Sequence, residues 1–289
     1  MSNHKVQHFV GLRIGTGEAN NIHVGKTDMV ENDAGVAAGL GFVYELYFRK
    51  WSFGIGIDGH YQYLNDHIQA FSDIFPRTDI NGEQVMYEYA YNMYRQSNHV
   101  AMVSVPFYIG RDCGQWVYIH VGGRFSIPLW SYYSVKTDMY TQGNYVWDIL
   151  PVRSEGGNDF SAMGYYPNQP ITYESTYTDY MQIGAYLEVG GYLPLPEESK
   201  ESVRLRLGVY GNVNWRIGTL SGGRIADYST VDTNPHTQSL DNLKNMVRYH
   251  ALTTTDAYSA LPLNLEVGIR LTCLFNVTGN HEECRCESY

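Results

Sequence analysis

Eight stretches of the chain alternate apolar side chains with polar or glycine residues at every second position. A period of two is typical of β-strands with two different faces. In the clearest stretch, residues 33–48, apolar side chains occupy every even position from Val36 to Phe48, while Gly39, Gly41 and Glu45 stand between them. The other stretches are 10–15, 51–63, 99–110, 117–129, 181–193, 203–215 and 263–275. Because eight strands are enough to close a sheet, the pattern predicts an all-β barrel.

The connections between these stretches alternate in length. Short ones lie near Arg49 and Lys50 and at 111–115 and 194–202, whereas long polar ones span 17–33, 65–97, 134–177 and 218–258. This alternation is typical of an antiparallel up-and-down transmembrane barrel, with short periplasmic turns and long extracellular loops. Within the long connections, residues 67–75 and 239–251 have the spacing of short amphipathic helices, the second with Ser239 as its cap.

The two faces of the strands differ in a way that indicates lipid outside. One face is nearly continuous Val, Ile, Leu and Phe, with Trp51, Tyr61, Tyr63 and Trp215 near strand ends, where interfacial aromatic girdles lie. The other face carries nine ionisable residues with many glycines and almost no lysine. They are Arg13, Glu45, Asp58, Arg124, Glu188, Arg204, Arg206, Glu266 and Arg270. A soluble lipocalin-type barrel or β-sandwich, which turns its apolar residues inward, is the alternative.

The strand pattern, the loop alternation and the final strand LEVGIRLTCLF resemble the small outer-membrane β-barrel proteins of the OmpA/OmpX type. The final strand is similar to the C-terminal assembly signal of that family, with Glu266, Gly268, Leu271, Cys273 and Phe275 in its pattern. The resemblance implies a barrel over residues 1–277 in the bacterial outer membrane and a short periplasmic tail, 278–289. That tail departs from the family pattern, and the peptidoglycan-binding domain of OmpA is not expected here.

Composition limits the other classes of function. The 20 basic and 30 acidic residues give a formal net charge of −10, which disfavours nucleic-acid binding. Four cysteines in 289 residues exclude a disulfide scaffold, but Cys113 has a possible partner in Cys284 or Cys286 in an oxidising periplasm. No apolar run is long enough for a transmembrane helix. The printed sequence begins without a secretory signal, so we expect a signal peptide that has been removed.

The nine inward ionisable residues carry the main chemical prediction. Five arginines and four carboxylates nearly balance, and an unpaired buried charge is strongly unfavourable, so we expect a filled, charge-paired lumen. A narrow gated pore is the alternative. His60 and His120 share this face with Asp58 and Ser126, but no catalytic motif accompanies them, so we expect no enzyme activity, cofactor or metal.

The long connections are the expected working surface. Aromatic side chains with polar tips suit both recognition and packing among themselves. The connection 134–177 is rich in them: Tyr140, Tyr145, Trp147, Tyr165, Tyr166, Tyr173 and Tyr177. We therefore expect a structural or interaction protein that contacts outer-membrane lipid or lipopolysaccharide and, through its loops, an extracellular ligand. The alternatives are an accessory subunit of an outer-membrane complex for uptake, secretion or barrel assembly, and a narrow porin-like channel.

Overall fold

Ten antiparallel β-strands form one sheet in the computed structural model. The structure describes residues 6–22, 30–68, 70–78, 84–145, 166–177, 179–196, 202–217 and 263–278. The strands are β1 (Gln7–Ile22), β2 (Val30–Phe48), β3 (Trp51–Ile68), β4 (Phe71–Thr78), β5 (Gln84–Cys113), β6 (Val117–Tyr145), β7 (Tyr166–Tyr177), β8 (Met181–Tyr192), β9 (Val203–Ile217) and β10 (Leu263–Asn276). No helix in these ranges is long and apolar enough to cross a membrane.

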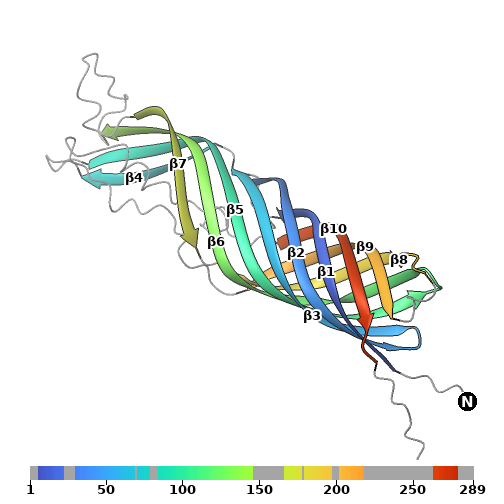
Figure 1. The fold of residues 1–289 in the computed structure, drawn as a ribbon. Coiled ribbons are helices and arrows are strands. Elements are labelled where there is room, and N and C mark those ends of the chain that lie inside the picture. The colour runs from blue at the N-terminus through green and yellow to red at the C-terminus, as the bar shows by residue number, and fades with distance from the viewer. Residues whose placement is uncertain are drawn as a thin grey trace, which may run out of the picture.

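Eight of the strands close into a ring in the order β1-β2-β3-β5-β6-β8-β9-β10 (Figure 1). The first and last strands close it, with a register that runs from Phe9 opposite Asn276 to Ile22 opposite Leu263. Each strand pairs antiparallel with its neighbours on both sides. The predicted eight-stranded, antiparallel up-and-down fold is therefore confirmed.

Two ring strands continue far beyond the others. β5 has 30 residues and β6 has 29, compared with 16 in β1 and 15 in β9. β4 pairs with the start of β5, and β7 pairs with the distal part of β6. Together β4, β7 and the segments 84–99 of β5 and 131–145 of β6 form a four-stranded extension, here called the arm (Figure 1). We call this end of the ring the arm end and the opposite end the turn end.

Much of the arm is formed by segments that the sequence pattern predicted to be loops. The described parts of 65–97 and 134–177 lie largely in strands, and the segment 67–75, predicted as a helix, contains the end of β3 and the start of β4. The apolar residues of this segment have helical spacing, but Phe71 and Phe75 face Tyr91 and Tyr87 in a strand register. Sheet pairing with β5 therefore overrides the local periodicity. The other predicted helix, 239–251, lies outside the described residues.

The turn end is closed by tight connections. β2 and β3 are joined by two residues, and Arg49 there adopts a left-handed conformation with φ of 57°. Gly114 has φ of 88° in the β5–β6 turn, where a glycine is favoured over other residues. β1 begins and β10 ends at this same end, and Val277 donates a backbone hydrogen bond to His8 over 2.8 Å.

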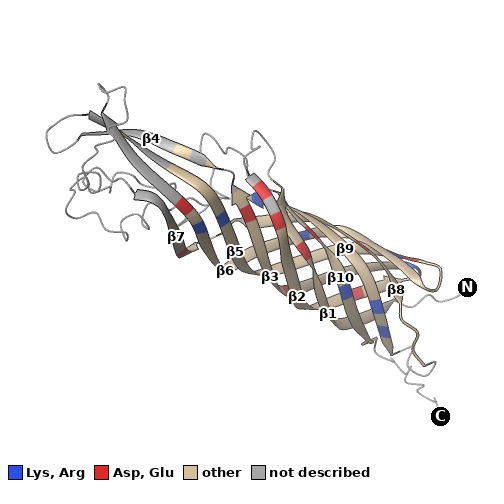
Figure 2. Ribbon diagram, turned by 90° about the horizontal axis from the view of Figure 1, so that it is seen from above, with Lys and Arg blue, Asp and Glu red and all other residues tan. Residues whose placement is uncertain are grey.

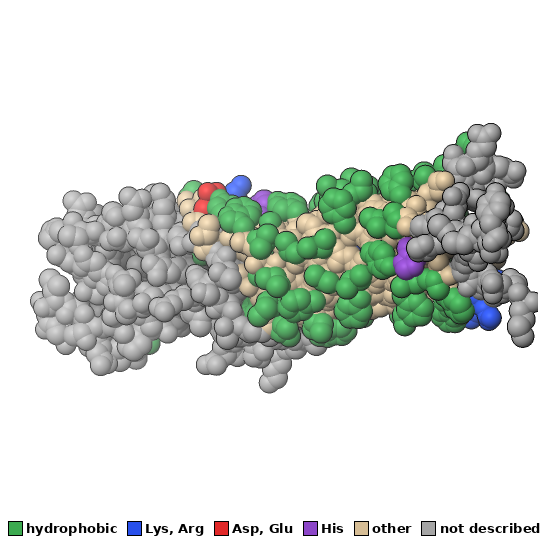
Figure 3. All heavy atoms as spheres, turned by 60° about the horizontal axis from the view of Figure 1, so that its bottom comes forward, with side chains coloured by type: hydrophobic (Ala, Val, Ile, Leu, Met, Phe, Trp, Pro, Cys, Tyr) green, Lys and Arg blue, Asp and Glu red, His purple; other side chains and the backbone are tan. Residues whose placement is uncertain are grey.

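The ring is apolar outside and polar inside, as the alternation predicts. Leu40 and Phe42 are each 61% exposed, and apolar side chains cover the visible wall between the two ends (Figure 3). Inward side chains are buried, and many are charged or polar. A smaller apolar cluster fills the turn-end part of the interior: Phe9, Val43, Tyr47, Tyr108, Tyr186, Tyr210 and Leu274.

Gly54 provides a test of how tightly this interior is packed. A Cβ at this inward position would lie 2.2 Å from Cζ of Tyr108, whereas at outward Gly59 on the same strand the nearest atom is 3.8 Å away. We expect Gly54→Ala to lower the free energy of unfolding by about 1–3 kcal/mol through overpacking. Gly59→Ala, the matched control, should change it by less than about 0.5 kcal/mol. Guanidinium unfolding in mild detergent, followed by tryptophan fluorescence, measures both; equal effects would contradict the packing described here.

Candidate functional site

The interior of the ring joins eight of the nine predicted ionisable residues into four arginine–carboxylate pairs. Arg13 contacts Asp58 at 2.6 Å, Arg124 contacts Glu266 at 3.0 Å, Arg270 contacts Glu188 at 3.0 Å, and Arg206 contacts Glu45. The carboxylates of Glu45 and Glu266 are fully shielded from solvent. Figure 2 marks both acidic and basic positions along the ring strands. Each inward charge of these pairs therefore meets its opposite.

The pair nearest the turn end is the most enclosed. Nη1 of Arg206 donates hydrogen bonds of 3.1 Å both to Glu45 and to the hydroxyl of Tyr47, and the hydroxyl of Tyr108 also donates to Glu45. The ring of His120 stacks on Tyr108 with centroids 4.5 Å apart. Charge pairing and aromatic packing thus occupy the same cross-section of the ring.

Tyrosines also satisfy the remaining glutamates. Tyr118 donates to Glu188 over 2.6 Å and Tyr186 donates to the second oxygen of that carboxylate, while Tyr210 donates to Glu266 over 2.7 Å. The guanidinium of Arg270 lies 4.2 Å from the ring centroid of Tyr210. The prediction of charge pairs did not include these tyrosines. Their positions on the polar face of the alternation were the available signal.

Towards the arm end, the interior becomes a network of amides and a further carboxylate. Nε2 of Gln62 and Nδ2 of Asn214 both donate to Asn264, at 2.9 and 3.1 Å. Beyond them, Asn21 and Asn98 donate to Asp66 at 3.1 and 3.0 Å.

The inward arginine nearest the arm end is Arg216. It donates to Asn21 at 3.0 Å and lies 3.8 Å from Asp179. Asp66, Asp179 and Arg216 were not predicted because each lies outside the recognised alternation: Asp66 and Arg216 follow a stretch, and Asp179 precedes one. Side chains therefore fill the interior from the turn end to the arm end, as the narrow bore of an eight-stranded ring favours.

Arg204, the ninth predicted residue, lies apart from the pairs. Its guanidinium sits between the rings of Phe9 and Tyr47, 4.4 and 4.3 Å from their centroids, and donates to Oε1 of Gln7 over 2.9 Å. Among the residues described, no carboxylate lies within ion-pair distance of it. Arg204 therefore belongs to the turn-end mouth, in contrast to its neighbour Arg206.

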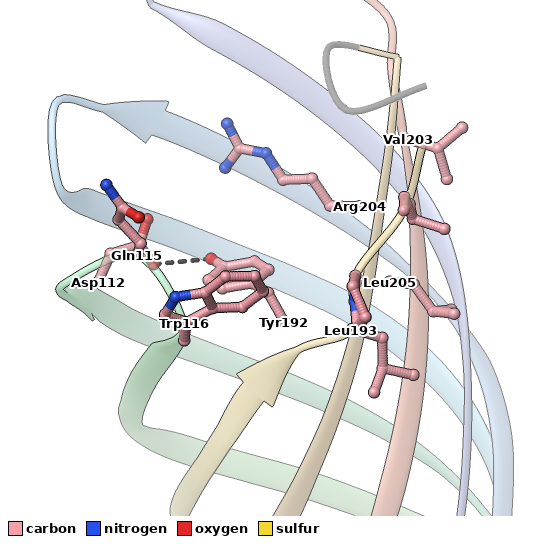
Figure 4. Close-up of a pocket in the computed structure, with 10 residues that line it drawn as sticks. Asp112, Gln115, Trp116, Tyr192, Leu193, Val203, Arg204 and Leu205 are labelled. Atoms are coloured by element: carbon pink, nitrogen blue, oxygen red, sulfur yellow. Dashed lines mark hydrogen bonds between the residues drawn. The ribbon is translucent and has the colours of Figure 1, made fainter. Parts of the chain in front are cut away.

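A pocket of about 370 Å³ opens at this mouth. Figure 4 shows Arg204 extending towards Asp112 and Gln115, with Trp116 beside Tyr192. The hydroxyl of Tyr192 donates to Asp112 over 2.7 Å. The pocket thus combines an aromatic wall with groups of both charges.

The predicted assembly-signal residues all lie in β10. Glu266 faces inward, while Leu271, Cys273 and Phe275 face outward. A Cβ at Gly268 would lie 2.3 Å from the backbone oxygen of Thr16, so β10 requires a glycine where it pairs with β1. The strand therefore closes the ring; its role as an assembly signal remains a prediction.

The predicted loop aromatics fall in the arm or outside the described residues. Tyr140 and Tyr145 lie in β6, and Tyr166, Tyr173 and Tyr177 lie in β7. Trp147 and Tyr165 lie outside the described ranges, as do Cys284 and Cys286.

The residues considered for catalysis have structural contacts. His60 lies 3.3 Å from Glu266, and Ser126 accepts a hydrogen bond from Arg124 and shares one with Ser104. The described part of the chain contains no group of three or more metal-ligating side chains. Cys113 is exposed at the end of β5.

Comparisons with known proteins find a likeness among solved structures. No family model matches the chain, and no curated protein sequence matches it. Among solved structures, the chain is similar to the crystal structure of Neisserial surface protein A, with 9% sequence identity and a TM-score of 0.28. The match covers 92% of this chain and 95% of that chain.

The Glu45–Arg206 pair can be tested with a double-mutant cycle. Glu45→Gln or Arg206→Gln alone should lower the free energy of unfolding by about 3–5 kcal/mol, because either change leaves a buried charge without its partner. The double variant should lose less than the sum, with a coupling of about 0.5–3 kcal/mol. Arg204→Gln, two residues along the same strand, is the matched control and should lose no more than about 1 kcal/mol. Additive effects in denaturant unfolding would show that the pair does not act as a unit.

Proposed function

We propose that this protein is a non-enzymatic, integral β-barrel protein of a bacterial outer membrane, in which a plugged ring carries the arm outside the cell as an interaction surface. The observation that carries this proposal is the closed eight-stranded ring, apolar outside and charge-paired within. The resemblance to the OmpA/OmpX type, seen in the sequence pattern, is compatible with it.

The outer wall is suited to lipid. Exposed residues such as Ile57 (54%), Val121 (58%) and Ile269 (56%) lie on three different ring strands, so the apolar surface extends around the ring. Monomeric soluble proteins rarely expose contiguous apolar patches larger than a few hundred Å². A closed ring also leaves no unpaired strand edge inside the hydrocarbon, which is a requirement for any membrane-spanning sheet.

The two ends of the ring determine the proposed orientation. The turn end has short connections, and the arm end carries the long extensions of β5 and β6. Outer-membrane barrels have short turns on the periplasmic side and long segments on the extracellular side. We therefore assign the turn end to the periplasm and the arm to the cell exterior.

The arm has the features of an interaction surface. In the described sheet, β4 and β7 each have one neighbouring strand, so each presents an edge. Such edges can accept an added strand from another chain through backbone hydrogen bonds. The long paired β5 and β6 provide a stiff support that holds these edges away from the ring.

The proposed orientation can be tested with epitope insertions. The first tag is inserted between Thr78 and Gln84, in the connection from β4 to β5. The second is inserted after Gly114 in the β5–β6 turn, where an added Cβ meets no atom within 4 Å. We expect antibody to bind the first tag on intact cells and the second only after the outer membrane is permeabilised. The two insertions control for each other, provided both variants run as heat-modifiable folded bands. Reversed labelling, or a protein that stays soluble without detergent, would refute the proposal.

A filled interior also predicts a lack of conduction. In planar bilayers the wild-type protein should give no resolvable single-channel steps, because paired side chains occupy the bore. Glu266→Ala and Arg124→Ala should remain silent, since the surrounding tyrosines and amides still fill the interior. Wild-type steps that change with either substitution would instead support the narrow porin-like channel.

A further inference from the structure

Two basic side chains face each other on the outer surface where the arm leaves the ring. Arg95 on β5 and Lys136 on β6 are direct cross-strand partners, and both are exposed. Like charges placed directly opposite in a sheet repel each other. No ion pair or hydrogen bond joins either one to a carboxylate in the described part of the chain. An anion bound between the two side chains would relieve this repulsion.

A polar pocket of about 270 Å³ lies beside these two cations. The next row of the sheet pairs Ser97 with Ser134 and with Asn65, and all three line the pocket. Oγ of Ser97 donates to Asn65 over 2.9 Å, which orders this part of the pocket. Hydroxyl and amide groups next to two cations are the donors that a phosphorylated sugar requires.

An aromatic patch adjoins the pocket on the side of the ring. His99 lies against Tyr63 and Tyr132, with ring centroids 4.9 and 5.6 Å apart, and Trp130 stacks on Tyr132 at 6.0 Å. Aromatic side chains of this kind mark the level of the lipid headgroups in membrane proteins. Arg95 lies four residues from His99 on β5, towards the arm end, which is about 13 Å at about 3.3 Å per residue. The cations therefore lie just beyond the lipid boundary on the outward face.

We propose that Arg95 and Lys136, with Ser97, Ser134 and Asn65, form a binding site for the phosphorylated sugar headgroup of an outer-leaflet glycolipid. The inference rests on the proposed membrane location of the ring. The aromatic patch contacts the sugar and upper acyl region, and the two cations hold a phosphate.

Acidic groups on the same face set the limits of the site. Asp33 lines the far side of the pocket on β2, two strands away from Arg95. Glu174 on β7 accepts a hydrogen bond from Ser134 over 3.5 Å, and Asp138 follows Lys136 along β6. These carboxylates border the site, so the groups that an anion would contact are Arg95 and Lys136 themselves.

The test compares two charge-neutralising double variants. The full chain is placed in phosphatidylcholine nanodiscs and titrated with lipid A that carries two phosphates, with bound lipid counted by native mass spectrometry. We expect Arg95→Gln with Lys136→Gln to weaken binding at least about tenfold, which corresponds to about 1.4 kcal/mol. Arg49→Gln with Lys50→Gln removes the same charges at the turn end and should bind as the wild type does. Exchange of the two residues, Arg95→Lys with Lys136→Arg, should retain binding.

Further measurements identify the source of the phosphate and distinguish failure of this site from failure of the proposed function. Dephosphorylated lipid A should bind the wild type as weakly as lipid A binds the glutamine variant, and inorganic phosphate at equal concentration should not displace lipid A. Equal binding to both glutamine variants, or full displacement by inorganic phosphate, would overturn the glycolipid site while the ring stays inserted and folded. Failure of the wild-type chain to insert into nanodiscs would overturn the membrane proposal, and this site with it.

Discussion

Closure of the sheet between β1 and β10 is the constraint on which the rest of the structure depends. These two strands lie far apart in the sequence, but they pair from Phe9–Asn276 to Ile22–Leu263. Their pairing removes the free edges of the ring. Only closure distinguishes an inside from an outside. It brings Arg206 of β9 to Glu45 of β2, 161 positions away in the sequence, across the seam between β10 and β1. The apolar exterior and the paired interior are therefore both consequences of one strand pairing.

The alternation of side chains predicted the ring well because each ring strand separates two very different environments. From Val36 to Phe48 the even residues are apolar and outward, and the same rule holds for Ile55 and Ile57 in the next strand. The rule failed in β4, where alternate positions of the sequence show no such contrast. There Phe71, Asp73 and Phe75 alternate with Ser72 and Ile74, so polarity no longer reports the strand period. Pairing with β5 forms β4, and only the three-dimensional structure shows this pairing.

The interior site was predictable by face but not by partner. Alternation placed Arg204 and Arg206 on the same inward face, yet one meets Glu45 and the other lies between two aromatic rings. Which arginine reaches a carboxylate depends on the stagger of strands that are far apart in the sequence. The tyrosines that complete the network, such as Tyr108 and Tyr186, share the inward positions with the charges. A tyrosine side chain on that face combines an apolar ring with a hydroxyl donor. It can therefore fill a narrow bore and donate a hydrogen bond to a carboxylate at the same time.

The long strands β5 and β6 link the two parts of the molecule. Their ring segments carry inward groups of the paired interior, such as Arg124, and their arm segments carry the outward row of Arg95 and Lys136. A bulge at Ala101 and Met102 opposite Trp130 and Pro128 separates these segments on β5 and β6, and it shifts which side chains of β6 face outward. Ile127 therefore faces outward below the bulge, and Tyr132 and Lys136 do so above it. One irregularity in the register thus lets the same strand present apolar residues to lipid and, beyond the boundary, cations to an anionic headgroup.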